Sequence, residues 1–200
     1  MESRAKGSIV LGVVAALRKL RRSGNIEDEQ FSARLSGAAL SLLGQKIEIG
    51  RWYPMAVFAE LVDFEWEMAG ARDPEYARQS GCKSAEILFQ SGRYQQLEFA
   101  RRAGKAESRD ALIRRMKLIT TITSTLYNYL EVSVGIDAAR SNELQITYDN
   151  AAEFNEALRY SSEGFMNGIN AIQGSSRRWT SERVAPDRVV FRLAIPTRLT

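Results

Sequence analysis

The last third of the chain shows two periodicities, the alternation typical of strands and the wider spacing typical of a helix. Residues Glu131–Asp137 and 144–148 alternate apolar and polar side chains, which predicts two strands. Residues 151–173 have the spacing of one long helix. Asp149 is a candidate N-cap for this helix, and Gly174 is a residue type at which helices commonly end.

A second pair of strands is predicted close to the end of the chain. Residues 177–183 and 188–195 would form it, and the sequence Val-Ala-Pro-Asp at 184–187 would be its turn. The order of elements is then strand, strand, helix, strand, strand. This order predicts an antiparallel sheet with one helix laid across one of its faces.

Residues 1–130 are predicted to be mostly helical, with a short extended piece at 46–49. After a first helix near residues 8–22, the predicted helices cover 27–43 (closed by Gly44), 54–68 (with Pro54 at its first position), 73–90, a shorter segment between Gly92 and Gly104, and 109–130 (capped by Ser108). No linker or internal repeat divides the chain. We therefore expect one α+β domain over residues 1–200, an N-terminal helical layer at 1–130 followed by an antiparallel sheet of hairpin–helix–hairpin order at 131–200.

The segment of the first helix resembles a signal peptide, because basic residues precede an apolar run at 8–17. The run ends in the basic residues 18–22 rather than at a cleavage site, and it is too short to cross a bilayer. An anchor lying on a membrane surface is a second alternative, but the stretch has little polar face. We expect a buried first helix in a cytoplasmic protein.

Composition agrees with a folded domain and narrows the function. Hydrophobic residues make up 44% of the chain and charged residues 26%, values typical of globular proteins rather than disordered ones. The net charge of +4 is too small to indicate nucleic-acid binding without a focused patch. The single cysteine excludes an internal disulfide.

Several short segments of the chain carry a family resemblance. They are residues 6–12 (Lys-Gly-Ser-Ile-Val-Leu-Gly), Trp52-Tyr53-Pro54, Ser80-Gly81, Gly92-Arg93-Tyr94 and residues 164–168 (Gly-Phe-Met-Asn-Gly). In this order the chain resembles, over almost its whole length, the scaffold shared by haem-nitric-oxide-binding domains, four-vinyl-reductase-like small-molecule-binding domains and the Bet-type subunits of TRAPP tethering complexes. Within that superfamily it resembles an uncharacterised myxobacterial paralogous family.

The chain departs from the haem-binding branch because it contains no histidine. The resemblance implies a proximal histidine on the haem iron, and neither Cys82 nor any tyrosine lies in a motif that predicts a substitute ligand. The same absence removes Ser–His and Cys–His nucleophile pairs and most zinc sites. We therefore expect no haem, no other cofactor, no metal and no enzymatic activity.

Two groups of carboxylates are candidate sites. Glu60, Asp63 and Glu67 share a helix face at a spacing that can offer oxygen ligands to a hard cation. Glu153 and Glu156 are spaced three apart with Arg159 on the late helix. In both groups a solvated helix face is the favoured interpretation.

A cationic segment suggests a surface for a partner. Its members end one predicted helix and begin the next, so their side chains can converge near the connecting loop; they are Arg101, Arg102, Lys105, Arg109, Arg114, Arg115 and Lys117. Arginine binds carboxylates and phosphates well, so this segment is a candidate surface for an acidic protein partner or a nucleotide-like ligand. A solvated helix face with local ion pairs is the alternative.

An apolar pocket is the second candidate site. The resemblance implies a pocket, or its remnant, between the helices and the sheet, and in the TRAPP subunits a cysteine opens onto a tunnel for an acyl chain. Cys82 is a candidate for that position, although a buried, unreactive cysteine is the commoner arrangement. The candidate pocket residues are Cys82, Trp66, Phe89, Phe154 and Phe165.

These observations predict a non-enzymatic cytoplasmic regulatory or adaptor domain that acts through protein–protein interaction. The alternative is a sensor for a small molecule or an acyl chain, which requires a cavity of about 300 Å³ or more. The segment 55–68 carries more apolar surface than one helix face can bury, which predicts a homodimer or a complex with another protein. The sequence alone identifies neither the ligand nor the partner.

Overall fold

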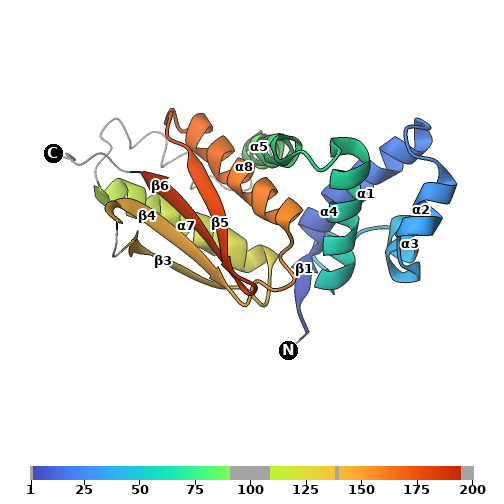
Figure 1. Cartoon of the computed structure of the whole chain (residues 1–200), viewed down its shortest axis with the longest axis horizontal. Helices are drawn as coiled ribbons and strands as arrows, with labels where there is room; N and C mark the ends of the chain where they lie inside the picture. The colour runs from blue at the N-terminus through green and yellow to red at the C-terminus, as the bar shows by residue number, and fades with distance from the viewer. Residues whose placement is uncertain (1, 91–108, 138–139, 195–200) are drawn as a thin grey trace.

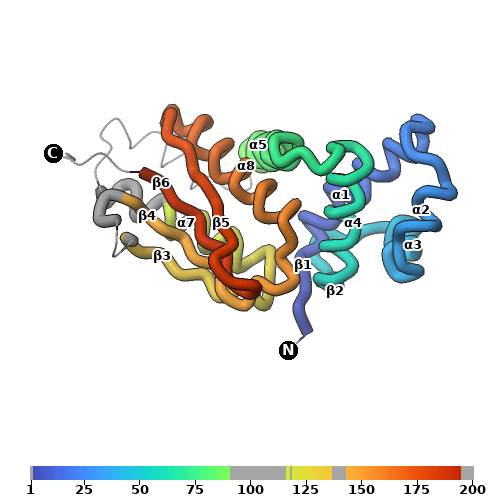
Figure 2. The backbone as a smooth tube through the Cα atoms, viewed as in Figure 1, coloured from blue at the N-terminus to red at the C-terminus, as the bar shows by residue number. Residues whose placement is uncertain are grey.

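A helical lobe and a sheet lobe lie side by side in the protein (Figures 1 and 2). The structure is a computed structural model and describes residues 2–90, 109–137 and 140–194. The short helix predicted between Gly92 and Gly104, and the cap predicted at Ser108, lie outside these ranges. The described elements confirm the predicted fold class, a helical layer followed by an antiparallel sheet of hairpin–helix–hairpin order.

The helical lobe is built mainly from five helices among the described residues. They are α1 (Gly7–Arg22), α2 (Asp28–Arg34), α3 (Gly37–Gly44), α4 (Met55–Gly70) and α5 (Pro74–Gln90), whereas α7 (Arg109–Leu126) lies with the sheet. Strands β1 (Arg4–Lys6) and β2 (Trp52–Pro54) form a small antiparallel pair that the sequence did not predict. Three residues are too few for alternation to be recognised.

The helix predicted over 27–43 is wrong as one element, because the chain leaves helical geometry between α2 and α3. Leu35 and Ser36 are both extended. The Ser36 hydroxyl caps α3 by accepting from the Ala39 N–H at 3.2 Å, while Glu60 of α4 accepts from the Ser36 N–H and hydroxyl. The break is therefore held by a side-chain cap and by a carboxylate from another helix. Residues 46–49 form no strand either.

Helix α1 is part of the core, as predicted. Val10, Val14 and Leu17 are fully buried on one side of it, and its last turn is basic, which suits the negative end of a helix dipole. The signal-like run of apolar residues thus packs inside the helical lobe. Within the described ranges, none of the helices has the length and apolar character needed to cross a membrane.

The sheet lobe has four antiparallel strands in the order β3 (Glu131–Asp137), β4 (Arg140–Asp149), β6 (Arg188–Ala194) and β5 (Trp179–Ala185). One face is apolar, because residues in register across the central strands, such as Tyr148 with Val189 and Ile146 with Phe191, are buried on it. Helix α7 lies on this face through a hydrogen bond of 2.9 Å between the hydroxyls of Thr123 and Tyr148. Helix α8 (Glu156–Ile172) packs on the same face, where its Arg159 donates to the Ser181 carbonyl of β5.

Helix α8 begins five residues later than predicted, and Asp149 is not its cap. The N-cap is Asn155, whose side-chain oxygen accepts from the Leu158 N–H at 3.0 Å. The Asn155 amide also donates to the Ala59 carbonyl of α4 at 2.8 Å. Asp149 instead pairs with Arg188 across the sheet.

We therefore expect Asn155→Ala to lower the free energy of unfolding by about 1–2 kcal/mol, because it removes both a helix cap and a tie between the lobes. Asp149→Ala is the matched control and should change it by less than about 1 kcal/mol, since its ion pair is exposed. Urea unfolding followed by circular dichroism measures both values. Equal losses for the two variants would contradict this assignment of the cap.

Helix α4 does not expose the apolar surface that was expected to bind a second chain or another protein. Its apolar residues Phe58, Leu61 and Phe64 are buried within the lobe, and Val57 and Met68 are only partly exposed. Among the described residues, the exposed large hydrophobic side chains lie elsewhere, at Leu11, Ile49, Ile87 and Val184. Neighbouring helices cover several sides of α4, so segment 55–68 does not present the exposed apolar surface predicted for it.

Candidate functional site

The two lobes meet along a seam where α5 and α8 run in backbone contact. A Cβ atom placed on Gly81 of α5 would lie 1.9 Å from the carbonyl oxygen of Ser161. A Cβ atom placed on Gly164 of α8 would lie 2.0 Å from the carbonyl oxygen of Arg78. Only glycine permits such an approach, so this α5–α8 seam depends on these two positions.

Cys82 lies in the α5–α8 seam. Its Sγ donates a hydrogen bond to the Gly164 carbonyl at 3.0 Å, and its backbone lies against Gly168. Burial, followed by the negative charge of Glu75, raises the pKa of the Cys82 thiol. The group is therefore held as a thiol rather than a thiolate at neutral pH, and it faces a helix backbone.

The other candidate pocket residues lie in two separate clusters. Trp66 packs with Ala77, Ala157 and Tyr160, and its indole N–H donates to the Asp73 carbonyl at 2.7 Å. Phe154 belongs to the main core, where its ring meets those of Tyr127 and Tyr148 edge-on at 5.5 Å. Phe89 and Phe165 are partly buried against the same main core.

Two hollows in the described part lie beside Phe89 and Trp66, and both are small. A hollow lined by Ala85, Phe89, Ile169, Ile172 and Gln173 has no room for a water molecule. A second hollow, beside Trp66, has a volume of about 30 Å³, enough for a water molecule. Pockets for drug-sized ligands run from about 300 to 1,000 Å³, so neither hollow is of that class.

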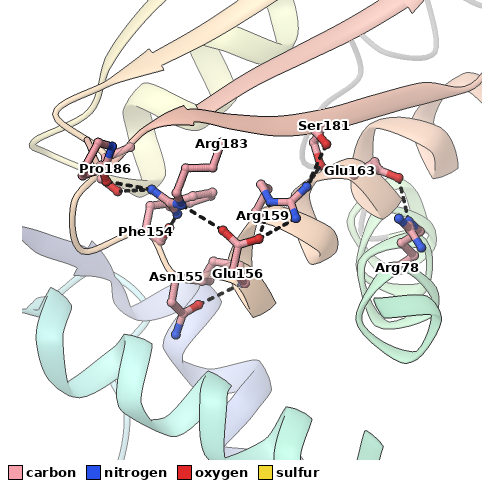
Figure 3. Close-up of polar contacts among 11 residues, drawn as sticks. Arg78, Phe154, Asn155, Glu156, Arg159, Glu163, Ser181, Arg183 and Pro186 are labelled. Atoms are coloured by element: carbon pink, nitrogen blue, oxygen red, sulfur yellow. Dashed lines mark hydrogen bonds and ion pairs between the residues drawn. The ribbon is translucent and has the colours of Figure 1, made fainter. Parts of the chain in front are cut away.

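A polar network joins α8 to strand β5 and to α5 (Figure 3). Arg159, which is 8% exposed, donates to Glu156 at 2.5 Å and to the Ser181 carbonyl at 2.7 Å. Arg183 donates to the other oxygen of Glu156 at 2.8 Å. Burial alone would raise the pKa of Glu156, but hydrogen bonds and charge from Arg159 and Arg183 outweigh it and hold that pKa below its usual value.

Glu163 is the most buried carboxylate of this network and completes it toward α5. Its residue is 5% exposed, and its two oxygens accept from Arg78 at 2.6 Å and from the Ser181 hydroxyl at 2.5 Å. The interpretation of Glu156 and Arg159 as a solvated face is therefore wrong, although Glu153 is exposed. A sequence signal existed, because residues 156, 159 and 163 share one helix face and 181 and 183 share one strand face.

The carboxylates of α4 also have partners inside the molecule. Glu67 pairs with Arg34 of α2 and with Arg72, and Asp63 pairs with Arg72 at 3.1 Å. Glu60 accepts from Ser36, as described above. These three residues tie neighbouring segments together, and the described residues contain no group of three or more potential ligand side chains for a metal ion.

The cationic segment falls mostly outside the described part. Arg101, Arg102 and Lys105 lie in the range 91–108, and only the backbone of Arg109, Arg114 and Arg115 is described, within α7. Lys117 is exposed on α7. The convergence of these side chains therefore stays a prediction.

Comparison with solved structures gives matches over nearly the whole chain. An alanine-to-glycine mutant of the Fe(II) unliganded H-NOX protein from K. algicida superposes with a TM-score of 0.62 at 16% identity, covering 97% of this chain and 98% of that chain. The chain has an H-NOX fold. A T. tengcongensis H-NOX mutant matches with a TM-score of 0.55 at 15% identity, covering 98% and 100% of the two chains. No protein-family model and no curated protein matches the chain.

The H-NOX fold implies haem, and the residues of this chain do not fit that group. The sequence has no histidine to bind the iron. In the described part, the Cys82 thiol donates a hydrogen bond to the Gly164 carbonyl. The two hollows described there hold at most a water-sized molecule. Haem would require both an iron ligand and a far larger space.

Proposed function

We propose that this H-NOX-fold chain is a non-enzymatic, cytoplasmic regulatory or adaptor domain that acts through contact with another protein or with a second copy of itself. The observation that carries the proposal is the filled interior. A core of apolar side chains packs between helices and sheet in the described part, and the two hollows described there hold no more than about a water molecule. A domain with a filled interior signals through its surface.

The use of charged groups supports the same conclusion. The buried network of Glu163, Arg159 and Ser181 consists of hydrogen bonds within the molecule, and none of its carboxylates is free to act as a general acid or base. Such a network fixes the orientation of α8 on the sheet. A fixed packing of α8 on the sheet suits a domain that presents a constant surface to its partner.

The candidate partner surface remains the cationic segment from Arg101 to Lys117. Its charges would attract an acidic partner over a screening length of about 8 Å at physiological salt. A homodimer or hetero-complex is part of this proposal.

The alternative function is sensing of an apolar small molecule or acyl chain, and one observation favours it. Both polar atoms of the Gln173 amide, beside Phe89 and Ile172, are buried without a hydrogen-bond partner. A ligand with a polar group would supply that partner. The closed hollow at this place weighs against it.

Native mass spectrometry of the protein isolated without denaturation distinguishes the two functions. The adaptor function predicts the mass of two or more 22.5 kDa chains, or of one chain plus another polypeptide. The sensor function predicts a further mass of a few hundred daltons that leaves on collisional activation. Such a mass at one per chain would overturn the adaptor proposal.

A further inference from the structure

Glu65 of α4 carries a carboxyl group placed where three helices meet. It lines the water-sized hollow of about 30 Å³ together with Val62 and Trp66 of α4, Tyr76, Ala77 and Ser80 of α5, and Ala157 and Ser161 of α8. Its hydrogen bond within the described part is with the Tyr76 hydroxyl, at a long 3.3 Å. The hollow therefore contains one weakly bonded acid among mostly apolar walls.

The charged groups around this hollow are committed elsewhere. From the α4–α5 turn, Arg72 lies over the Trp66 ring at 5.6 Å but pairs with Asp63 and Glu67. Glu65 has no ion-pair partner among the described residues. An ionised carboxylate here would lack the compensation that buried charges normally have.

The charged groups of α5 and α8 near the hollow also pair with residues other than Glu65. Arg78 and Arg159 lie over the Tyr160 ring at 4.9 and 4.0 Å, and they bond to Glu163 and Glu156 respectively. From these helices the Tyr76 hydroxyl bonds to Glu65, and Ser80 and Ser161 are the other polar residues that line the hollow. A hydroxyl can accept from a protonated carboxyl as well as donate to an ionised one.

We propose that the Glu65 hollow is a proton-binding site that sets how tightly α4, α5 and α8 pack. With the proton bound, the neutral carboxyl and the Tyr76 hydroxyl close the hollow. When the proton leaves, the carboxylate requires water, which enters the hollow and loosens the junction between the two lobes. This proposal does not depend on the adaptor function, since it concerns only the packing of the chain.

The direction of the pH effect follows from the environment of Glu65. Burial raises its pKa from 4.5 to about 7, and the hydrogen bond from Tyr76 opposes only part of that rise. Burial, and then the charge of Glu65, raises the pKa of Tyr76 to about 12, so this hydroxyl stays protonated. The stabilising effect of proton binding is complete below pH 4.5 and is lost as the pH rises to about 7.

Hydrogen–deuterium exchange of peptides covering residues 62–80 tests the proposal. After correction for the intrinsic pH dependence of exchange, wild-type opening should increase about tenfold between pH 6 and pH 8. Glu65→Gln, which imitates the protonated acid, should remove this increase. Glu86→Gln, at an exposed position of α5, is the matched control and should behave as the wild type.

Carbon-13 NMR of the Glu65 carboxyl in the unmodified protein gives an independent readout if the variant folds poorly. A titration midpoint near pH 7 supports the site. A midpoint near pH 4.5, or exchange that does not change between pH 6 and pH 8, overturns it. A pH-dependent increase that persists in Glu65→Gln also overturns it, because the proton would then bind elsewhere.

Discussion

Replacing Gly81 or Gly164 with alanine should lower the free energy of unfolding by about 3 kcal/mol each, which corresponds to a fall in Tm of about 6–12 °C for a chain of this size. The added methyl group would lie 1.9–2.0 Å from a backbone carbonyl oxygen of the facing helix. A backbone atom cannot turn away as a side chain can, so α5 and α8 would have to separate. Their separation would also stretch the bond from Cys82 to the Gly164 carbonyl.

Gly12→Ala is the matched control for these substitutions. Gly12 lies inside α1, and a Cβ atom placed on it meets nothing within 4 Å. Alanine is the better helix former, so this variant should be more stable by about 0.5–1 kcal/mol. Thermal unfolding of the three variants measures the difference. A loss below 1 kcal/mol at both Gly81 and Gly164 would contradict the close α5–α8 seam.

Glu163→Ala should have the second large effect, a loss of about 3 kcal/mol in the free energy of unfolding. Removing one partner of a buried ion pair typically costs about 3–5 kcal/mol, because the remaining charge stays buried without its partner. The lower end applies here, since the Arg78 side chain is 32% exposed and can regain water. The Ser181 hydroxyl would also lose its acceptor.

The control for this variant is Glu182→Ala. Glu182 lies on β5 next to Ser181, the hydroxyl partner of Glu163. Glu182 pairs with Arg192, but its side chain is 63% exposed, so its removal should cost less than about 1 kcal/mol. Denaturant unfolding at neutral pH compares the two. If Glu163→Ala were no more destabilising than Glu182→Ala, the network of Figure 3 would not hold α8 on the sheet.

The sheet lobe was largely predictable from the sequence, because its residues alternate. Strand β3 has the predicted bounds, and strands β5 and β6 differ from the predicted segments by one or two residues at their ends. One face of these strands packs on helices while the other stays polar. Apolar and polar residues therefore alternate along each strand, and this alternation is visible in the sequence. The start of helix α5 was predictable from a different local signal, because Pro74 is its first residue.

The start of α8 could not be predicted, because contacts from distant residues decide it. Ala151 and Phe154 are apolar and fit the spacing of the helix that follows, so the sequence predicts a helix from residue 151 onward. Arg183 of strand β5 donates to the carbonyls of Ala151 and Phe154, and Asn155 supplies the cap. These bonds hold the segment as a loop, and they depend on how β5 lies against α8.

The candidate site was predictable only in part for the same reason. The missing histidine excluded the usual haem ligand directly from the sequence. The paired roles of Glu163 and Ser181 and the acid at Glu65 required the relative placement of α4, α5, α8 and β5. Polarity at a residue does not show whether it faces water or another side chain.

Titration of the purified protein with haemin, followed in the Soret region, tests most directly whether the interior of this H-NOX fold excludes haem. We expect the spectrum to remain that of free or nonspecifically bound haemin, without saturation at one haem per chain. This result follows from the missing histidine and from hollows of about 30 Å³ or less. A saturable Soret shift at one haem per chain would contradict the account.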